Sequence, residues 1–367
     1  MSLLMPVGVD PEEYRGYNGL PPPFEVSLPE GAVLDALRNR LGKHVDIDND
    51  LALLRLIGQH TIGRVTFGGP LANVAELDGR ILEAARSDRS VERLTNILRA
   101  HPQMFGVSGV MPKMSLGTNT GSRPGTLISH GSLVKFDSSD YPGASLVEYA
   151  CLKACARVGL AAPVMELAPD RRSIIVGRFD RDDRGRRLGF EDACALSGLR
   201  RAGKYKGSVE HLFRMVNSFV HPKDQARDRR FLLMMVVMSD VLRNGDAHLK
   251  NFGLLYGDNL ARPRLAPAYD MLTTCVWITK DTPAMPLRSC DDPGSGEWFD
   301  VRDLATLREI SGLDCDMPAL QTSCIEAAAS AMTEVLDESP QGLPHQALER
   351  ALRIVEKVNH PAGDHGR

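Results

Sequence analysis

The stretch SDVLRNGDAHLKNFGLLY, residues 239–256, places a run of polar side chains between two apolar segments. The residues that lead into it, RDRRFLLMMVVMSDVLRN (227–244), are apolar almost all round, which predicts a buried central helix. A buried helix that ends in a polar bend sets functional groups at the edge of a core. If the bend is tight, Asp246 and Asn251 project into one cleft, and LAPAYDMLTT (265–274) brings Asp270 soon afterwards.

The composition is that of an ordinary globular protein, because 43% of the 367 residues are hydrophobic and 25% are charged. The net charge of -3 gives no overall attraction to nucleic acid or to an anionic membrane. The seven cysteines are odd in number, scattered and without a CxxC pair, which argues against a disulfide framework and a zinc site. No stretch reaches the roughly 18 apolar residues of a membrane span, and the start lacks the features of a signal peptide. We therefore expect a cytoplasmic protein.

Changes in the sequence pattern predict three domains and an α+β fold class. Residues 1–100 are mostly helical, residues 101–200 form a small lobe of strands and one helix, and residues 201–367 form a helical lobe. Segment 46–60 predicts a helix with an Asn or Asp cap, and segment 74–100 predicts one further helix. Short β-type runs at 105–117, 129–137 and 171–192 surround a helix at 143–160, and two amphipathic helices at 316–339 and 344–359 close the chain.

The polar groups between residues 244 and 270 are those that phosphoryl transfer requires. One Asp orients the attacking hydroxyl, while an Asn and a second Asp hold Mg²⁺, because positioning and charge neutralisation supply most of the rate. Oxygen ligands suit this hard cation. His248 has no second His or Cys at ligand spacing, which argues against zinc.

Further residues follow in the order found in protein kinases, whose catalytic loop shares the Asp-x-x-x-x-Asn spacing of Asp246 and Asn251. LVKFD (133–137) puts Lys135 on a strand, where a kinase carries the Lys that contacts the phosphates. Glu148 follows on the predicted helix and is placed to pair with Lys135. Upstream, GVSGVMPKMSL (106–116) is a Gly-containing strand and turn whose N–H groups could cradle phosphates. Each feature alone has an ordinary structural explanation, but their shared order favours a kinase.

The sequence resembles the HipA family, the serine/threonine kinase toxins of bacterial toxin–antitoxin modules. The matching segments are GVSGVMPKMSL (106–116), LVKFD (133–137), VEYACLKACARVGL (147–160), GRFDRD (177–182), NGDAHLKN (244–251) and LAPAYDML (265–272). The last two are the most specific. The resemblance implies a two-lobed, protein-kinase-like fold with a small α/β N-terminal lobe and an all-α C-terminal lobe.

The resemblance also implies a role for each matching residue. Asp246 would be the catalytic residue that orients the substrate hydroxyl, supported by His248 and Lys250, while Asn251 and Asp270 would hold Mg²⁺.

In the small lobe, Lys135 would contact the ATP phosphates and pair with Glu148, and Phe179 would lie at the hinge against the adenine. The loop over the phosphates would comprise Val107, Ser108, Gly109, Val110, Met111 and Lys113.

The implied substrate is a Ser in a cytosolic protein, for some family members an aminoacyl-tRNA synthetase. The implied partner is a small DNA-binding antitoxin of the HipB type, through which alone the protein would meet DNA. Family toxins often phosphorylate a Ser of their own phosphate loop; Gly106 occupies that position here, so Ser108 is the candidate for autophosphorylation. Compared with the family pattern, we expect the N-terminal domain to be without its opening β-rich portion, so that either a separate small protein completes it or the chain dispenses with it.

Two other functions stay open. A small-molecule kinase of the aminoglycoside or choline kinase type also carries an Asp-x-His-x-x-x-Asn-like loop and a metal Asp, and an acidic acceptor pocket would mark it. A non-catalytic corepressor that binds the antitoxin is the other, although intact Lys135, Asp246, Asn251 and Asp270 argue against it. The basic segment RRAGKYKGS (200–208) predicts either a solvated loop or a contact with an acidic partner.

Overall fold

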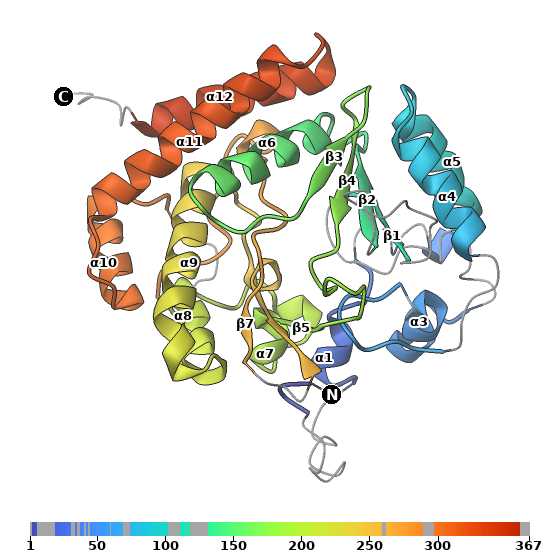
Figure 1. Ribbon diagram of the computed structural model, residues 1–367, viewed down its shortest axis with the longest axis horizontal. Coiled ribbons are helices and arrows are strands. Elements are labelled where there is room, and N and C mark those ends of the chain that lie inside the picture. The colour runs from blue at the N-terminus through green and yellow to red at the C-terminus, as the bar shows by residue number, and fades with distance from the viewer. Residues whose placement is uncertain are drawn as a thin grey trace. The chain divides into compact units, whose positions relative to one another are not determined.

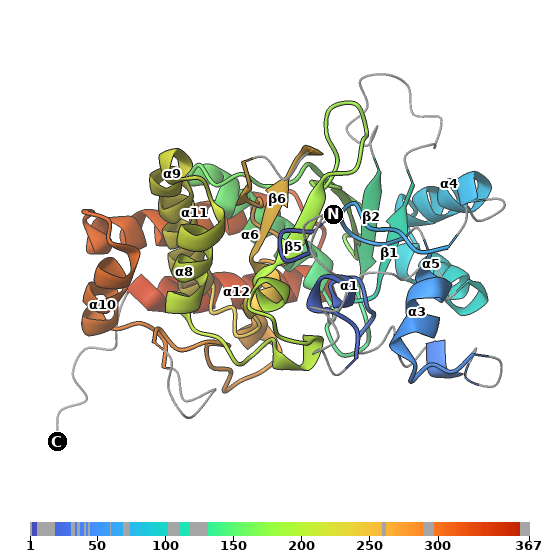
Figure 2. The same ribbon diagram turned by 90° about the horizontal axis from the view of Figure 1, so that it is seen from below.

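The computed structural model describes residues 2–5, 19–30, 34, 37–39, 42, 45–58, 60–68, 74–101, 111–117, 131–258, 262–288 and 297–359. The chain divides into two compact units, whose elements are labelled in Figures 1 and 2. The first comprises Met1–Tyr141, Val164–Arg201 and Leu254–Ala261, and the second comprises Pro142–Pro163, Ala202–Gly253 and Arg262–Arg367. The α+β fold class predicted from the sequence is confirmed.

The first unit is built on an antiparallel four-stranded sheet in the order β1-β2-β4-β3 (Figure 1). The strands are β1 (Lys113–Leu116), β2 (Ser132–Phe136), β3 (Met165–Leu167) and β4 (Ser173–Gly177). Alternate side chains of a strand point to opposite faces, so Val134 and Phe136 of β2 lie on one face and Lys135 on the other. The first face joins a core with leucines and isoleucines of the preceding helices, among them Leu54 and Ile81. The predicted first domain and the sheet of the predicted second domain therefore share one core.

Among the described residues, three helices of eight residues or more precede this sheet. Helix α3 (Asp50–Ile57) begins after Asn49, whose side chain accepts the N–H groups of Leu51 at 3.0 Å and Ala52 at 3.1 Å, which confirms the predicted cap. The single helix predicted over 74–100 is wrong, because α4 (Val74–Ala85) and α5 (Ser90–Ala100) are separate. Between them Ser87 Oγ accepts the Arg89 N–H at 3.0 Å, a local hydrogen bond that competes with the helical one.

Smaller elements complete the first unit. Segment 19–30 contains one helical turn, α1 (Pro22–Glu25). Strand β5 (Gly189–Asp192) lies beside β6 (Gly253–Tyr256) and runs into α7 (Ala193–Leu196). Strands β1, β2, β4 and β5 fall within the predicted β-type runs; β3 was missed because it is a three-residue edge strand without a buried face.

The GRFDRD motif fastens the segment around Thr61 to the sheet. Arg178 donates to Asp180 Oδ1 at 2.8 Å, to Ser115 Oγ at 2.5 Å and to the Thr61 carbonyl at 2.7 Å. The other oxygen of Asp180 accepts the Gly63 N–H at 2.6 Å and an Arg181 N–H at 2.7 Å. Burial alone would raise the pKa of Asp180, but the two arginines and the hydrogen bonds outweigh it and lower the pKa to about 2.

The second unit is helical among its described residues, apart from the two-residue strand β7 (Arg264–Leu265) and the first residue of β6. Its long helices are α6 (Ala144–Arg157), α8 (Val209–Phe219), α9 (Pro222–Val241), α10 (Val301–Ser311), α11 (Met317–Asp337) and α12 (Leu343–Asn359). Short 3₁₀ turns lie at Arg201–Gly203, Leu249–Asn251 and Thr274–Val276. The predicted central buried helix is confirmed as α9, and the two predicted closing helices are α11 and α12.

Helix α6 belongs to this second unit, although its place between strands in the sequence indicated the small lobe. It packs against α11 and α12, and ten of its side chains are buried. Lys153 donates to Glu334 of α11 at 2.7 Å, and Arg157 donates to Ser330 at 3.0 Å and also contacts Glu334. Helix α6 therefore belongs to the second unit because its buried side chains pack against α11 and α12.

Among the described helices, none combines the length and the apolar character needed to cross a bilayer.

Candidate active site

The polar bend that follows α9 is held as a tight loop. Arg243 has a positive φ of 53°, and the Asn244 N–H donates to the Ser239 carbonyl at 2.9 Å, which ends the helix. The loop closes in the 3₁₀ turn Leu249–Asn251, where Asn251 Oδ1 accepts the His248 N–H at 3.1 Å. Asp246 and Asn251 are thereby fixed on one short loop.

The Asp270 segment is tied to this loop by side chains. Tyr269 donates its hydroxyl to the Lys250 carbonyl at 2.8 Å, and Asn244 Nδ2 lies 3.5 Å from the Asp270 carbonyl. Thr274 accepts the Gly245 N–H at 2.6 Å. Asp270 itself adopts a positive φ of 51°. The structure therefore brings together the segments that carry Asp246, Asn251 and Asp270.

Asp246 is the most open of the loop's polar side chains. Its side chain is 30% exposed, whereas that of His248 is 8% exposed. Oδ1 accepts the Tyr205 hydroxyl at 2.7 Å and lies 3.7 Å from His248 Nε2. Among the described residues, Oδ2 has no hydrogen-bond partner, so one oxygen of the carboxylate is held and the other is available.

His248 and Lys250 are buried beside this carboxylate, and each is less than a tenth exposed. Burial lowers the pKa of His248 to about 4, with Lys204 and Lys250 acting in the same direction against Asp246. The imidazole is therefore neutral at physiological pH and is a poor proton acceptor there. This leaves Asp246 as the loop residue fitted to receive a proton.

Two residues near the loop were missed by sequence reasoning. Tyr205 lies in the basic segment 200–208, and the Asp281 carboxylate occupies the space that a Cβ on Gly245 would fill. Both arrive through tertiary contacts from distant parts of the sequence, and no local pattern marks them.

The residues present fit a bound Mg²⁺. Asn251 offers an amide oxygen and Asp270 a carboxylate, which are hard ligands of the kind that this cation takes alongside water and phosphate oxygens. Among the described residues there is no group of three His, Cys, Asp or Glu side chains at metal-binding distance.

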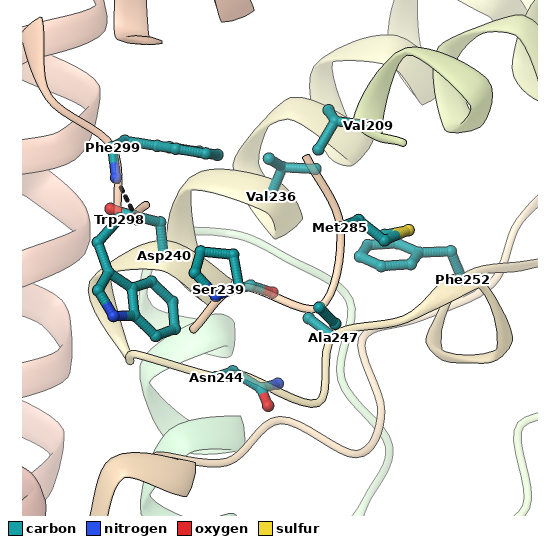
Figure 3. A pocket seen from close by; sticks show the side chains of 12 residues that line it. Val209, Val236, Ser239, Asp240, Asn244, Ala247, Phe252, Met285, Trp298 and Phe299 are labelled. Carbon is teal, nitrogen blue, oxygen red and sulfur yellow. Dashed lines mark hydrogen bonds between the residues drawn. The ribbon is translucent and has the colours of Figure 1, made fainter. Parts of the chain in front are cut away.

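A small, mostly apolar pocket of about 40 Å³ adjoins the loop (Figure 3). Asn244 and Ala247 form one of its walls, while Val236, Met285 and Phe299 supply apolar surface. Its lining residues are Val209, Val236, Ser239, Asp240, Asn244, Ala247, Phe252, Pro283, Ala284, Met285, Trp298 and Phe299.

The pocket has a single acidic residue, Asp240, which is already engaged. Its carboxylate accepts the Phe299 N–H at 2.9 Å, drawn as a dashed line in Figure 3, and an Arg243 N–H at 3.1 Å. Burial nevertheless raises the pKa of Asp240 to about 6. The pocket is therefore not a strongly acidic one.

The predicted ATP residues Lys113 and Lys135 lie in the first unit. They are directly opposite each other in the β1–β2 register, and both are buried, at 3% and 4% exposure. Their side chains share the face of the sheet that is turned away from the apolar core.

The remaining predicted residues are spread over both units. Met111 is buried, and Phe179 packs its ring against Phe190 with centroids 5.6 Å apart, both in the first unit. Glu148 is buried on α6 in the second unit, so its pairing with Lys135 stays a prediction. Val107, Ser108, Gly109 and Val110 lie outside the described residues.

Solved and curated proteins are similar to this chain in fold or in sequence. HipA of Shewanella oneidensis MR-1, solved with HipB and operator DNA, superposes with a TM-score of 0.65 and 21% identity over 92% of this chain and 84% of that one. The likeness shows the two-lobed, kinase-like fold expected from the sequence.

Two putative kinases of Sinorhizobium fredii are sequence relatives. Y4dM is 29% identical over 85% of this chain and 76% of its own length. Y4mE is 25% identical over 87% of this chain and 79% of its own length. These relatives support a phosphotransferase.

Family models match most of the sequence. The HipA-like C-terminal domain matches residues 105–341, and the HipA N-terminal domain matches residues 1–68. Because the first model alone covers more than half of the chain, the protein belongs to the HipA family.

Proposed function

We propose that this protein is an ATP- and Mg²⁺-dependent protein serine/threonine kinase of the HipA toxin type. The observation that carries the proposal is the fastening of the Asp246–Asn251 loop to the Asp270 segment by Tyr269, Asn244 and Thr274. This gathers one proton acceptor and two oxygen ligands, the set that phosphoryl transfer needs.

In the proposed reaction, the hydroxyl oxygen of the substrate forms a bond to the γ-phosphorus of ATP. The bond from that phosphorus to the β–γ bridging oxygen breaks, ADP leaves, and the hydroxyl proton passes to Asp246. Mg²⁺, when held by Asn251 and Asp270, would neutralise phosphate charge. Lys113 and Lys135 would bind the phosphates, since their shared, buried face suits a polyanion.

The partner proposals rest on the family. The matched HipA of Shewanella oneidensis was solved with HipB and operator DNA, which supports a small DNA-binding antitoxin as a partner here. A cytoplasmic location, a growth-arresting role and autophosphorylation at Ser108 belong to the same proposal.

The pocket beside the loop bears on the small-molecule alternative. Aminoglycosides and choline are cations, and an acceptor site for them needs uncompensated negative charge. The single acidic residue of this pocket is paired with Arg243 and a backbone N–H, and its other lining is mostly apolar. This pocket therefore does not supply the acidic acceptor site that a cationic metabolite would need.

The test uses the purified full chain, γ-labelled ATP, Mg²⁺ and a bacterial lysate. Wild type is expected to label protein Ser, while Asp246→Asn should lose at least about 100-fold in rate, the usual contribution of a positioned proton acceptor. The control is Asp183→Asn, which removes the same charge from an exposed position in the first unit. Its rate should match that of wild type.

Equal labelling by wild type and Asp246→Asn would reject the catalytic assignment, and label in a small metabolite alone would favour the alternative. Mass spectrometry of the protein after incubation with ATP tests Ser108 separately. Phosphate on other residues but not on Ser108 would reject that candidate.

A further inference from the structure

The hydroxyl of Tyr205 is hydrogen-bonded to one oxygen of the proposed catalytic carboxylate. It donates to Asp246 Oδ1 at 2.7 Å, and both residues belong to the second unit. Asp246 Oδ2 accepts no hydrogen bond from the described residues. A carboxylate held on one oxygen only presents the other in a fixed direction, which is what a proton acceptor in phosphoryl transfer requires.

The segment around Tyr205 is itself fixed to the catalytic loop. The Leu249 N–H donates to the Lys204 carbonyl at 3.1 Å. Gly207 lies so close to the buried Leu249 side chain that a Cβ on Gly207 would collide with it. The backbone on both sides of Tyr205 therefore follows the loop, and the phenol does not depend on a freely moving chain.

The ring of Tyr205 is oriented by its neighbours. Its edge packs against the neutral imidazole of His248 with centroids 5.2 Å apart and an interplanar angle of 73°. The Lys204 ammonium lies 5.1 Å from the centre of the Tyr205 ring. These contacts aim the hydroxyl at Asp246 while the residue stays 42% exposed.

We propose that Tyr205 is a positioning residue for the reaction, which holds Asp246 so that Oδ2 receives the proton of the acceptor hydroxyl. The inference rests on the proposed function of Asp246 and adds a residue that acts through it. Tyr205 transfers no proton, because its own hydroxyl remains the donor to Oδ1 throughout. His248 supports the ring and stays uncharged.

The test compares Tyr205→Phe with Tyr149→Phe in the full chain. Tyr205→Phe removes only the hydroxyl and keeps the ring against His248, and Tyr149→Phe deletes the same group from α6, where the ring faces Lys153. Rates are measured with γ-labelled ATP, Mg²⁺ and a mixed library of Ser-containing peptides. Tyr205→Phe should lower kcat about tenfold, the equivalent of one lost hydrogen bond, with KM for ATP and the thermal midpoint unchanged. Tyr149→Phe should match wild type.

An unchanged kcat in Tyr205→Phe would overturn the proposal. A higher kcat would overturn it too, because the hydroxyl would then block the acceptor position. Crystal structures give a second readout that needs no turnover: Asp246 should adopt one orientation in wild type and more than one in Tyr205→Phe. An identical single orientation in both would reject the positioning role. Absence of transfer by wild type would reject the proposed function, while the orientation of Asp246 still decides this inference.

Discussion

The GRFDRD and NGDAHLKN motifs both carry an Asp among basic residues, yet their carboxylates have opposite environments. Asp180 is fully enclosed, and both of its oxygens accept hydrogen bonds from Arg178, Arg181 or the Gly63 N–H. Asp246 is partly exposed and has one engaged oxygen. A saturated carboxylate stabilises a fold, whereas a carboxylate with a held and an available oxygen is prepared for chemistry. The number of carboxylate oxygens that accept hydrogen bonds therefore distinguishes a structural Asp from a candidate catalytic one better than the amino-acid composition of the two motifs does.

The largest expected effect comes from exchanging the two carboxylates for amides. Asp180→Asn should lower the free energy of unfolding by about 3–5 kcal/mol, because it leaves buried arginines without their counter-charge. Asp246→Asn should lower it by less than about 1 kcal/mol, since that side chain is partly solvated. Urea unfolding at neutral pH measures both, with exposed Asp183→Asn as the control.

Similar losses of unfolding free energy in Asp180→Asn and Asp246→Asn would contradict the view that only Asp180 stabilises the fold. Asp180→Asn protein that remains folded should keep its phosphoryl-transfer rate, and a loss of rate without a loss of stability would assign Asp180 to the chemistry instead.

What the sequence could predict was local. The spacing of Asp246 and Asn251, the Asn49 cap and the apolar run in the second half of α9 are set by neighbours along the chain, and each is visible in a short window. Tyr205 and Asp281 reach the loop through tertiary contacts, which no window contains. The grouping of α6 with α11 and α12 likewise depends on segments far along the chain.

The break between α4 and α5 shows a local limit. The apolar periodicity continues across 74–100, and for that reason the prediction gave one helix. The Ser and Asp residues between α4 and α5, whose side chains favour a turn, were given too little weight. The roles of Lys135, Asn251 and Asp270 come from the family resemblance and stay predictions.

A pH series on His248 sharpens the comparison, because this residue is the buried neighbour of the open Asp246. Its pKa is lowered in the folded protein from 6.5 to about 4. The stability that it contributes is therefore fully present above pH 6.5 and is lost as the pH falls through about 4. His248→Gln cannot be protonated, so the advantage of wild type over this variant should shrink by about 3 kcal/mol across that range. Urea unfolding at several pH values measures it, and parallel curves for the two proteins would contradict the burial of a neutral imidazole.

The smallest expected effect concerns Asp240, which is intermediate between Asp180 and Asp246. Its Oδ1 is engaged by Arg243 and the Phe299 N–H, but Oδ2 is buried without a hydrogen-bond partner among the described residues. Burial raises its pKa from 3.8 to about 6, so the stability it contributes is present below pH 3.8 and is lost as the pH rises through about 6. The advantage of wild type over Asp240→Asn should therefore fall by about 2 kcal/mol between pH 4 and 6, opposite in sign to the His248 effect. The two variants are compared with wild type over the same pH range, and the stability differences should change with pH in opposite directions. A change in the same direction in both series would indicate that acid destabilises the whole protein, independently of these two residues. Opposite slopes would show that burial shifts the two pKa values in opposite directions, raising that of Asp240 and lowering that of His248.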